Sequence, residues 1–238
     1  MMNLVFLLDV DNTLLDNDRF SADLDARLRV DFGEPERLRY RQIYKRLRDR
    51  LGYADYLGAL QEFRVDVADD AQDRLLGASG FMLDYPFADR IYPLVAEVIE
   101  HLDELGTTAI LSDGDIVFQP HKIRRSGLSD RVQGRVMVTV HKERCLDVVQ
   151  RRWPADHYVL VDDKPTLLSA MKEKLGRKAT TVFVRQGHYA DEAALSSESG
   201  IDISIASIGE LAVMECSRFV PRSSSATPSR APIPTEAP

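Results

Sequence analysis

Residues 4–14 read LVFLLDVDNTL and combine a short apolar run with two aspartates spaced one residue apart. The run Leu4–Leu8 is too short to cross a membrane, and an uninterrupted apolar run of this length is typical of a parallel strand buried on both faces. Asp9 and Asp11 follow this strand directly. Ligands in open α/β sheets bind outside the carboxyl ends of the strands, so both aspartates are expected where chemistry takes place.

The spacing of Asp9 and Asp11 places both side chains on the same side of an extended chain. Two carboxylates this close repel each other unless a cation or a shared proton lies between them. A divalent metal ion would supply that cation. The alternative interpretation is a polar turn after a strand, because Asp, Asn and Thr all favour turns.

The overall composition indicates a globular protein with one large domain or a core plus a smaller module, since the chain has 238 residues and is 44% hydrophobic. A net charge of −7 disfavours general binding to nucleic acid. Cys145 and Cys216 are the only cysteines, which excludes a disulfide framework and indicates a reducing compartment. No segment approaches transmembrane length and residues 1–8 lack a charged signal-peptide start, so we expect a cytoplasmic protein without a membrane partner.

Residues 17–86 have the apolar spacing of helices and form a module, here called the cap, inserted after the first strand. Four helices are predicted: one with Phe20, Leu24, Leu28 and Phe32 on one face and Ser21 as its N-cap, one over Pro35–Leu51, one around Tyr53–Phe63 and one over Ala71–Met82.

The second cap helix is rich in basic residues, at Arg37, Arg39, Arg41, Lys45, Arg46, Arg48 and Arg50. They could form a patch for phosphorylated or nucleic-acid substrates, or a solvated helix face. We favour the solvated face, because the charges are spread around the helix and interrupted by acidic neighbours.

Residues 87–216 alternate between helices and short apolar strands, with strands expected at 107–111, 135–140, 158–161, 180–184 and 201–205. This alternation predicts an α/β fold in which residues 1–16 and 87–216 form a Rossmann-like parallel sheet with helices on both faces. Right-handed crossovers bring the carboxyl ends of the strands to one edge. Residues 217–238 are rich in Pro, Ser, Thr and Ala and are expected to be a disordered tail.

Polar residues occur where four of these strands end, namely Asp9 with Asp11, Ser112, Lys142, and Asp162 with Asp163. Each has a simpler explanation as a helix cap or a surface charge. Together, however, carboxylates, a hydroxyl and an ammonium on one edge are what metal-assisted phosphoryl transfer requires. Mg²⁺ prefers hard oxygen ligands and can be held by carboxylates of separate strands.

The chemical roles follow from charge. A carboxylate shielded by Mg²⁺ can attack phosphorus and form an aspartyl-phosphate. Ser112 can donate a hydrogen bond to a phosphoryl oxygen, and Lys142 can neutralise charge on the transferred group. The second aspartate, Asp11, can protonate the leaving oxygen and later deprotonate water.

The segments Asp9–Leu14, Leu111–Gly114, Lys142 and Val161–Asp163 together resemble the four ordered motifs of the haloacid dehalogenase-like (HAD) hydrolase superfamily. The resemblance extends over about residues 1–184 and includes a helical cap between the first two motifs. It implies Asp9 as nucleophile and metal ligand, and Asp11 as acid/base with its backbone carbonyl on Mg²⁺. For the last acidic pair it implies metal ligation, with Asp163 ahead of Asp162.

The resemblance also assigns Ser112, Asp113 and Lys142 to the phosphoryl group of the substrate, although two features depart from the usual motifs. Asp113 stands where Asn is common, which adds negative charge beside the phosphate site. Lys142 is followed by glutamate rather than proline, which leaves Lys122 as a second candidate for its role. His141 is interpreted as a surface residue.

These features predict a Mg²⁺-dependent phosphatase of a small phosphorylated metabolite. Asp11 argues against the dehalogenase branch, which lacks an acid/base aspartate at that position. A phosphomutase would use the same residues, and a non-enzymatic phosphoacceptor or binding module is a further alternative. The long insertion between Asp16 and Tyr92 disfavours a phosphoacceptor module. No nucleic-acid partner is expected, and the oligomeric state is left open.

Overall fold

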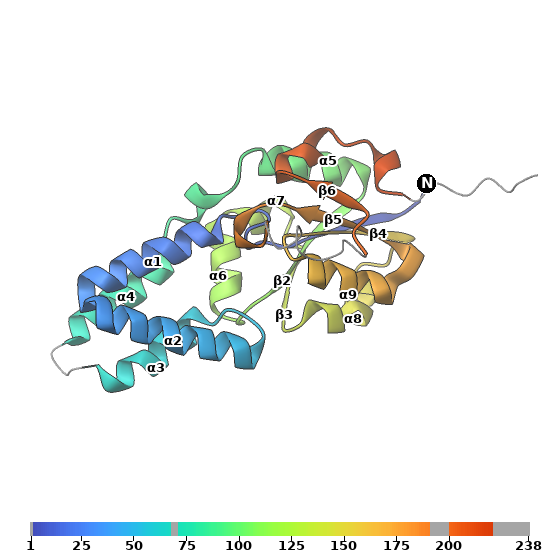
Figure 1. Ribbon diagram of the computed structural model, residues 1–238. Helices are drawn as coiled ribbons and strands as arrows, with labels where there is room; N and C mark the ends of the chain where they lie inside the picture. The colour runs from blue at the N-terminus through green and yellow to red at the C-terminus, as the bar shows by residue number, and fades with distance from the viewer. Residues whose placement is uncertain (1, 68–70, 191–199, 221–238) are drawn as a thin grey trace, which may run out of the picture.

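Strand β1 (Leu4–Leu8) lies in the middle of a six-stranded parallel sheet in the computed structural model, which describes residues 2–67, 71–190 and 200–220 (Figure 1). The strand order is β3-β2-β1-β4-β5-β6. The other strands are β2 (Thr107–Asp113), β3 (Val136–Thr139), β4 (His157–Asp162), β5 (Ala179–Val184) and β6 (Ile203–Ile205). The predicted α/β fold with a parallel sheet is therefore confirmed.

Alternate residues of β1 pack into two separate buried clusters, one on each face of the sheet. Leu4, Phe6 and Leu8 join the cluster under α5 (Val95–Leu105), α6 (Phe118–Arg125) and α7 (Leu128–Arg131). Val5 and Leu7 join the cluster under α8 (Leu146–Arg152) and α9 (Pro165–Leu175). Burial on both faces explains why this strand has no polar residue.

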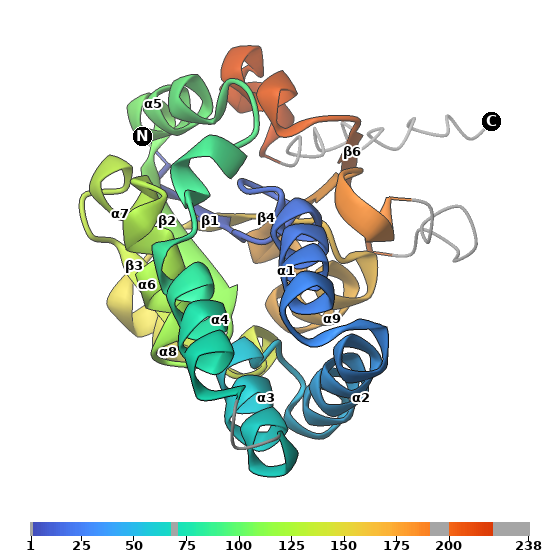
Figure 2. The ribbon, with the colours of Figure 1, turned by 90° about the vertical axis from the view of Figure 1, so that its left-hand side faces the viewer.

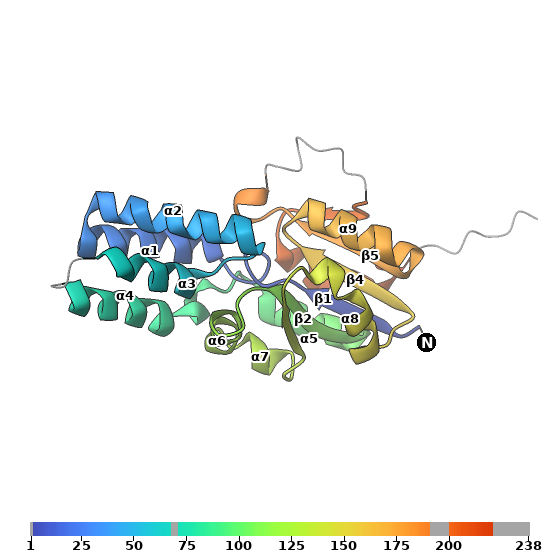
Figure 3. The ribbon, with the colours of Figure 1, turned by 90° about the horizontal axis from the view of Figure 1, so that it is seen from below.

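The cap consists of α1 (Asn17–Phe32), α2 (Glu34–Leu51), α3 (Tyr56–Phe63) and α4 (Gln72–Asp84). These helices lie beyond the carboxyl ends of the strands (Figure 3). Viewed from the cap end, α4 lies beside α6, while α1 lies near η6 (Gly187–Tyr189), the short turn that follows β5 (Figure 2).

An aromatic cluster joins the cap to the sheet. The ring of Phe20 on α1 has its centroid 5.1 Å from that of Tyr56, 5.2 Å from Phe87 and 5.7 Å from Phe118 on α6. All four rings are fully or almost fully buried. Aromatic pairs at these separations contribute beyond their buried area, so the cap and α6 share one apolar core.

Two boundaries predicted from the sequence are wrong. Helix α1 begins at Asn17 rather than after Ser21, because the side chain of Asp16 accepts a hydrogen bond from the backbone N–H of Arg19 at 2.9 Å and caps the helix. The ordered chain also continues beyond residue 216: Phe219 is fully buried, and its ring centroid lies 5.2 Å from that of Phe6. The remainder of the predicted tail, residues 221–238, lies outside the described residues.

Within the described ranges, none of the helices combines the length and the apolar character needed to span a membrane.

Candidate active site

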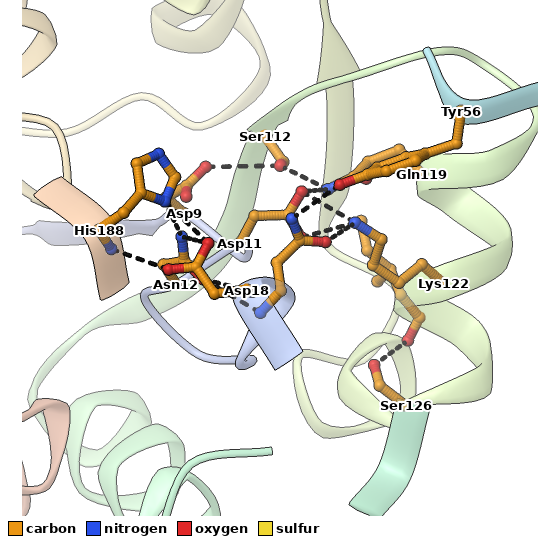
Figure 4. Close-up of polar contacts among 12 residues, drawn as sticks. Asp9, Asp11, Asn12, Asp18, Tyr56, Ser112, Gln119, Lys122, Ser126 and His188 are labelled. Carbon is orange, nitrogen blue, oxygen red and sulfur yellow. Dashed lines mark hydrogen bonds and ion pairs between the residues drawn. The ribbon is translucent and has the colours of Figure 1, made fainter. Parts of the chain in front are cut away.

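Asp9 lies directly after the central strand and is held by neighbouring strands. Its backbone N–H donates to the carbonyl of Val161 in β4 at 2.9 Å. Its Oδ1 accepts a hydrogen bond from Lys142 Nζ at 2.6 Å. The same oxygen accepts a hydrogen bond from Ser112 Oγ, in β2, at 3.4 Å (Figure 4). Its other oxygen, Oδ2, is buried and has no hydrogen-bond partner among the described residues. One oxygen of Asp9 is thus held by two hydrogen bonds, whereas the other is not engaged by any described residue.

Lys142 follows β3 and is only 2% exposed. Its Nζ lies 2.6 Å from Asp9 Oδ1 and 2.5 Å from Asp162 Oδ2. Burial alone would lower the pKa of Lys142, but the carboxylates of Asp162 and Asp9 outweigh it, so this pKa lies above its usual value. The side chain therefore carries a positive charge between two aspartates.

Asp9, Asp162 and Asp163 bring one carboxylate oxygen each to within 4.8 Å of one another. Both oxygens of Asp163 are buried and have no hydrogen-bond partner within residues 2–67, 71–190 and 200–220. Asp162, in contrast, accepts from Lys142 and from the backbone N–H of Lys164 at 2.9 Å. Burial, and then the charges of Asp162 and Asp9, raise the pKa of Asp163 to about 9. Unpaired buried carboxylates are costly, and a divalent cation with oxygen ligands fits this cluster.

Asp11 forms an ion pair with a different lysine, Lys122. Lys122 Nζ on α6 lies 2.7 Å from Oδ1 and 2.9 Å from Oδ2 of Asp11 (Figure 4). Gln119, one helical turn earlier, donates from Nε2 to Asp11 Oδ2 at 3.3 Å and to Ser112 Oγ at 3.0 Å. Lys122, the second candidate for the phosphate-binding lysine, thus contacts Asp11 and not Asp9.

Asn17 links this pair to the cap. Its Oδ1 accepts from Lys122 Nζ at 2.9 Å, and its Nδ2 donates to the hydroxyl of Tyr56 on α3 at 3.3 Å. Sequence reasoning missed Gln119 and Asn17. The three-residue spacing of Gln119 and Lys122 on a helix that follows the Ser112 strand is the signal that could have found the first of them.

Asp113 lies at the end of β2, and its Oδ1 accepts the backbone N–H of Lys142 at 2.9 Å. Burial raises the pKa of Asp113 to about 6, with Lys142 opposing the shift and Asp9 adding to it. This contact positions the loop that carries Lys142. The assignment of Asp113 to phosphate binding remains a prediction.

A cavity of about 800 Å³ separates the sheet edge from the cap. Asp11, Asp113 and Asp163 line its sheet side, and Tyr44, Arg48 and Tyr53 line its cap side. Cavities of this size accommodate small-molecule ligands. His141, interpreted from the sequence as a surface residue, also lines the cavity.

The turn between α2 and α3 approaches the sheet at His141. A Cβ added to Gly52, which has a φ of +81°, would lie 2.3 Å from Cε1 of the His141 ring. The left-handed backbone favours glycine at this position, and a larger residue would also have to displace the His141 ring.

The basic residues of α2 are mostly paired with acids, as expected for a solvated helix face. Arg41 contacts Asp25 at 2.6 Å, Lys45 contacts Asp49 at 2.6 Å, and Arg37 contacts Glu34 at 2.6 Å. Arg41 and Arg48 both line the cavity, but Arg48 contacts the hydroxyl of Tyr189 instead of a carboxylate of the described residues.

Comparison with solved structures shows the family. The chain is 50% identical to a structure from Burkholderia xenovorans LB400 described as a haloacid dehalogenase-like hydrolase, with a TM-score of 0.83, over 90% of this chain and 100% of the other. The chain therefore belongs to the haloacid dehalogenase-like hydrolases, as the sequence motifs predicted. Membership of this family supports the prediction that the protein is an enzyme.

Two more distant structures share the fold. They are the L-2-haloacid dehalogenase of Xanthobacter autotrophicus, at 17% identity and a TM-score of 0.57, and the HAD-hydrolase YfnB of Bacillus subtilis bound to magnesium, at 16% identity and a TM-score of 0.58. Each comparison covers 89% of this chain and 97% of the other. No protein-family model matches the sequence, and neither does any curated protein.

Proposed function

We propose that this hydrolase is a Mg²⁺-dependent phosphatase that acts on a small phosphorylated metabolite through an aspartyl-phosphate on Asp9. The observation that carries the proposal is the state of the two Asp9 oxygens: Oδ1 is fixed by Lys142 and Ser112, while Oδ2 has no hydrogen-bond partner. A nucleophilic carboxylate needs this combination of a fixed orientation and one available oxygen.

Asp9 and Asp163 are the proposed metal ligands, with Asp162 and the backbone carbonyl of Asp11 as further ligands. Asp163 ranks ahead of Asp162 because neither of its oxygens has a hydrogen-bond partner, whereas Asp162 is engaged by Lys142 and Lys164. When bound, Mg²⁺ would offset the negative charges of the carboxylates and of the substrate phosphate.

In the first step, Oδ2 of Asp9 attacks phosphorus as the bond from phosphorus to the leaving oxygen breaks. Asp11 acts in this step in its protonated form, not as the carboxylate paired with Lys122, and gives that proton to the leaving oxygen. Lys142 and Ser112 would stabilise the charge that develops on the phosphoryl group. In the second step, Asp11 takes a proton from water, the water oxygen attacks phosphorus, and Asp9 and inorganic phosphate are released. Lys122 and Gln119 hold Asp11 in position between the two steps.

Asp11 also supports a phosphatase over a dehalogenase, because displacement of a halide needs no proton donor at that position. A panel of phosphate monoesters assayed with Mg²⁺, beside 2-chloropropionate assayed for chloride release, tests the proposal. We expect phosphate release that is lost on chelation and no chloride release. Full phosphatase activity in excess EDTA, or chloride release without phosphatase activity, would reject it, and dependence on a bisphosphate activator would identify a mutase instead.

A further inference from the structure

Two cations that line the cavity, Arg48 and Lys164, form no direct ion pair with a carboxylate of the described residues. Most charged groups around the cavity are paired: Arg41 with Asp25 at 2.6 Å, and Lys122 with Asp11 at 2.7 Å. Among the residues that the structure describes, no carboxylate lies within 4.0 Å of the charged groups of Arg48 or Lys164. Arg48 therefore brings to the cavity a positive charge that no described carboxylate pairs with directly, whereas the nearby charges of Asp9, Asp162 and Asp163 stabilise the positive charge of Lys164 and raise its pKa, against the effect of burial.

One of these cations lies on the cap side of the cavity and the other on the sheet side, and both contact the side chain of Tyr189. Arg48, on α2 of the cap, donates from Nη2 to the hydroxyl of Tyr189. Lys164, which precedes α9, has its Nζ 5.7 Å from the centroid of the same ring. All three residues line the cavity. A phenol hydroxyl carries no formal charge, so Tyr189 orients the two cations without neutralising them.

The loop that carries Tyr189 is fixed in place. The neighbouring His188 donates its backbone N–H to Asp18 Oδ2 at 2.8 Å, and its Nδ1 lies 2.8 Å from Asp18 Oδ1. The rings of His188 and Tyr189 are 4.0 Å apart between centroids. Anchoring to the start of α1 means that the Tyr189 hydroxyl is held before any ligand arrives, as a preorganised site requires.

We propose that Arg48, Tyr189 and Lys164 form a second anion-binding site, and that the substrates are phosphate monoesters that carry another anionic group, a carboxylate or a second phosphate. The inference rests on the proposed phosphatase function and names its substrate class. A guanidinium has five N–H donors arranged to bind a planar or tetrahedral anion, and one contact to Tyr189 does not exhaust them. A cavity of about 800 Å³ also holds far more than one phosphate group.

The test uses ω-phosphooxy carboxylates with one to five methylene groups, each compared with its own primary amide. The amide has nearly the same shape but no charge. At the best spacer length, we expect kcat/KM of the wild-type protein to favour the acid by about 10- to 100-fold, the usual size of a charge-assisted hydrogen bond. A parallel series of alkanediol bisphosphates distinguishes a second phosphate from a carboxylate.

Arg48→Met should reduce this acid-to-amide ratio about 10-fold or more, and Arg48→Lys should restore part of it. Arg46→Met is the matched control on the same helix, because Arg46 is exposed and paired with Glu62; it should keep the wild-type ratio. A wild-type ratio near one at every spacer length, in both series, would overturn the inference, as would an unchanged ratio in Arg48→Met.

Binding separates this inference from the proposed function. Calorimetry with the Asp9→Asn variant measures the affinity for each acid and amide without turnover. Preference for the acids with no hydrolysis by the wild-type protein would support the second anion site and reject the phosphatase. Hydrolysis of acids and amides at equal rates, with equal affinities, would support the phosphatase and reject the second anion site.

Discussion

Lys122 and Asp11 form a bidentate ion pair, with Lys122 Nζ 2.7 and 2.9 Å from the two carboxylate oxygens, on a lysine that is only 1% exposed. Asp9 is held by a different lysine, Lys142. The two aspartates that follow β1 are therefore positioned separately, although one residue lies between them.

Lys122→Met should impair the proton transfers of Asp11 and spare the nucleophile. We expect turnover of alkyl phosphates to fall by up to about 100-fold, since a displacement of about 1 Å in a reacting group can cost that much. p-Nitrophenyl phosphate needs little protonation and should show a smaller loss. Steady-state kinetics on both esters, with Lys45→Met as an exposed control, checks this; equal losses on both esters would remove Lys122 as a positioning residue.

Asp9→Asn and Asp11→Asn should fail at different steps. The neutral amide at position 9 cannot attack phosphorus, so no covalent phosphoenzyme should form. Asp11→Asn keeps the nucleophile, and its turnover of alkyl esters should fall by roughly 10²–10⁴-fold, the usual contribution of general acid–base catalysis. Rapid-quench trapping distinguishes the two variants. A wild-type yield of phosphoenzyme from Asp9→Asn would exclude Asp9 as the nucleophile.

Phe219→Ala should destabilise the protein although residue 219 lies in a segment that the composition predicts to be disordered. The ring is fully buried against Phe6, and removing a buried phenylalanine ring typically costs roughly 3–5 kcal/mol. Arg218→Ala, at an exposed neighbour, should change the free energy of unfolding by less than about 0.5 kcal/mol. Urea unfolding of both variants gives the comparison, and similar midpoints would show that Phe219 does not pack as described.

His157 should make the protein sensitive to acid. Burial, with Lys172 adding to it, lowers the pKa of His157 in the folded state. The unfolded chain, with a histidine pKa of about 6.5, binds the proton more readily, so stability is present above that pH and is lost as the pH falls towards the lowered pKa. His157→Gln can keep the hydrogen bond to Thr180 but cannot take up a proton. The melting temperature of this variant should therefore fall less between pH 7 and pH 5 than that of the wild-type protein. An unchanged pH profile would contradict this.

The sequence predicted the features that depend on short stretches of chain. Asp9, Ser112 and Asp162 each end an apolar strand, and parallel strands bring such residues to one edge whatever the details of packing. The first residue of α1 was harder to predict, because four nearby residues are all good N-caps: Asp16, Asn17, Asp18 and Ser21. The apolar spacing shows which face of the helix is buried, but not at which residue the helix begins.

The partners of Asp11 could not be predicted, because they depend on packing between distant segments. Lys122 and Gln119 lie more than 100 residues along the chain from Asp11, and they meet it only because α6 packs beside the first strand and the cap. Phe219 escaped prediction for the same reason, since one buried ring in a polar segment has no periodic pattern around it.

The central place of β1 also affects how the chain emerges from the ribosome. Val5 pairs opposite Thr107, and Leu4 pairs opposite His157, so both edges of β1 stay open until residues far downstream have been made. At the usual rate of synthesis this interval lasts roughly 10–30 s. β1, the strand that Asp9 follows, is thus translated before both of the strands that pair with it, and its backbone hydrogen-bonding groups on both edges stay unpaired until those strands have been made.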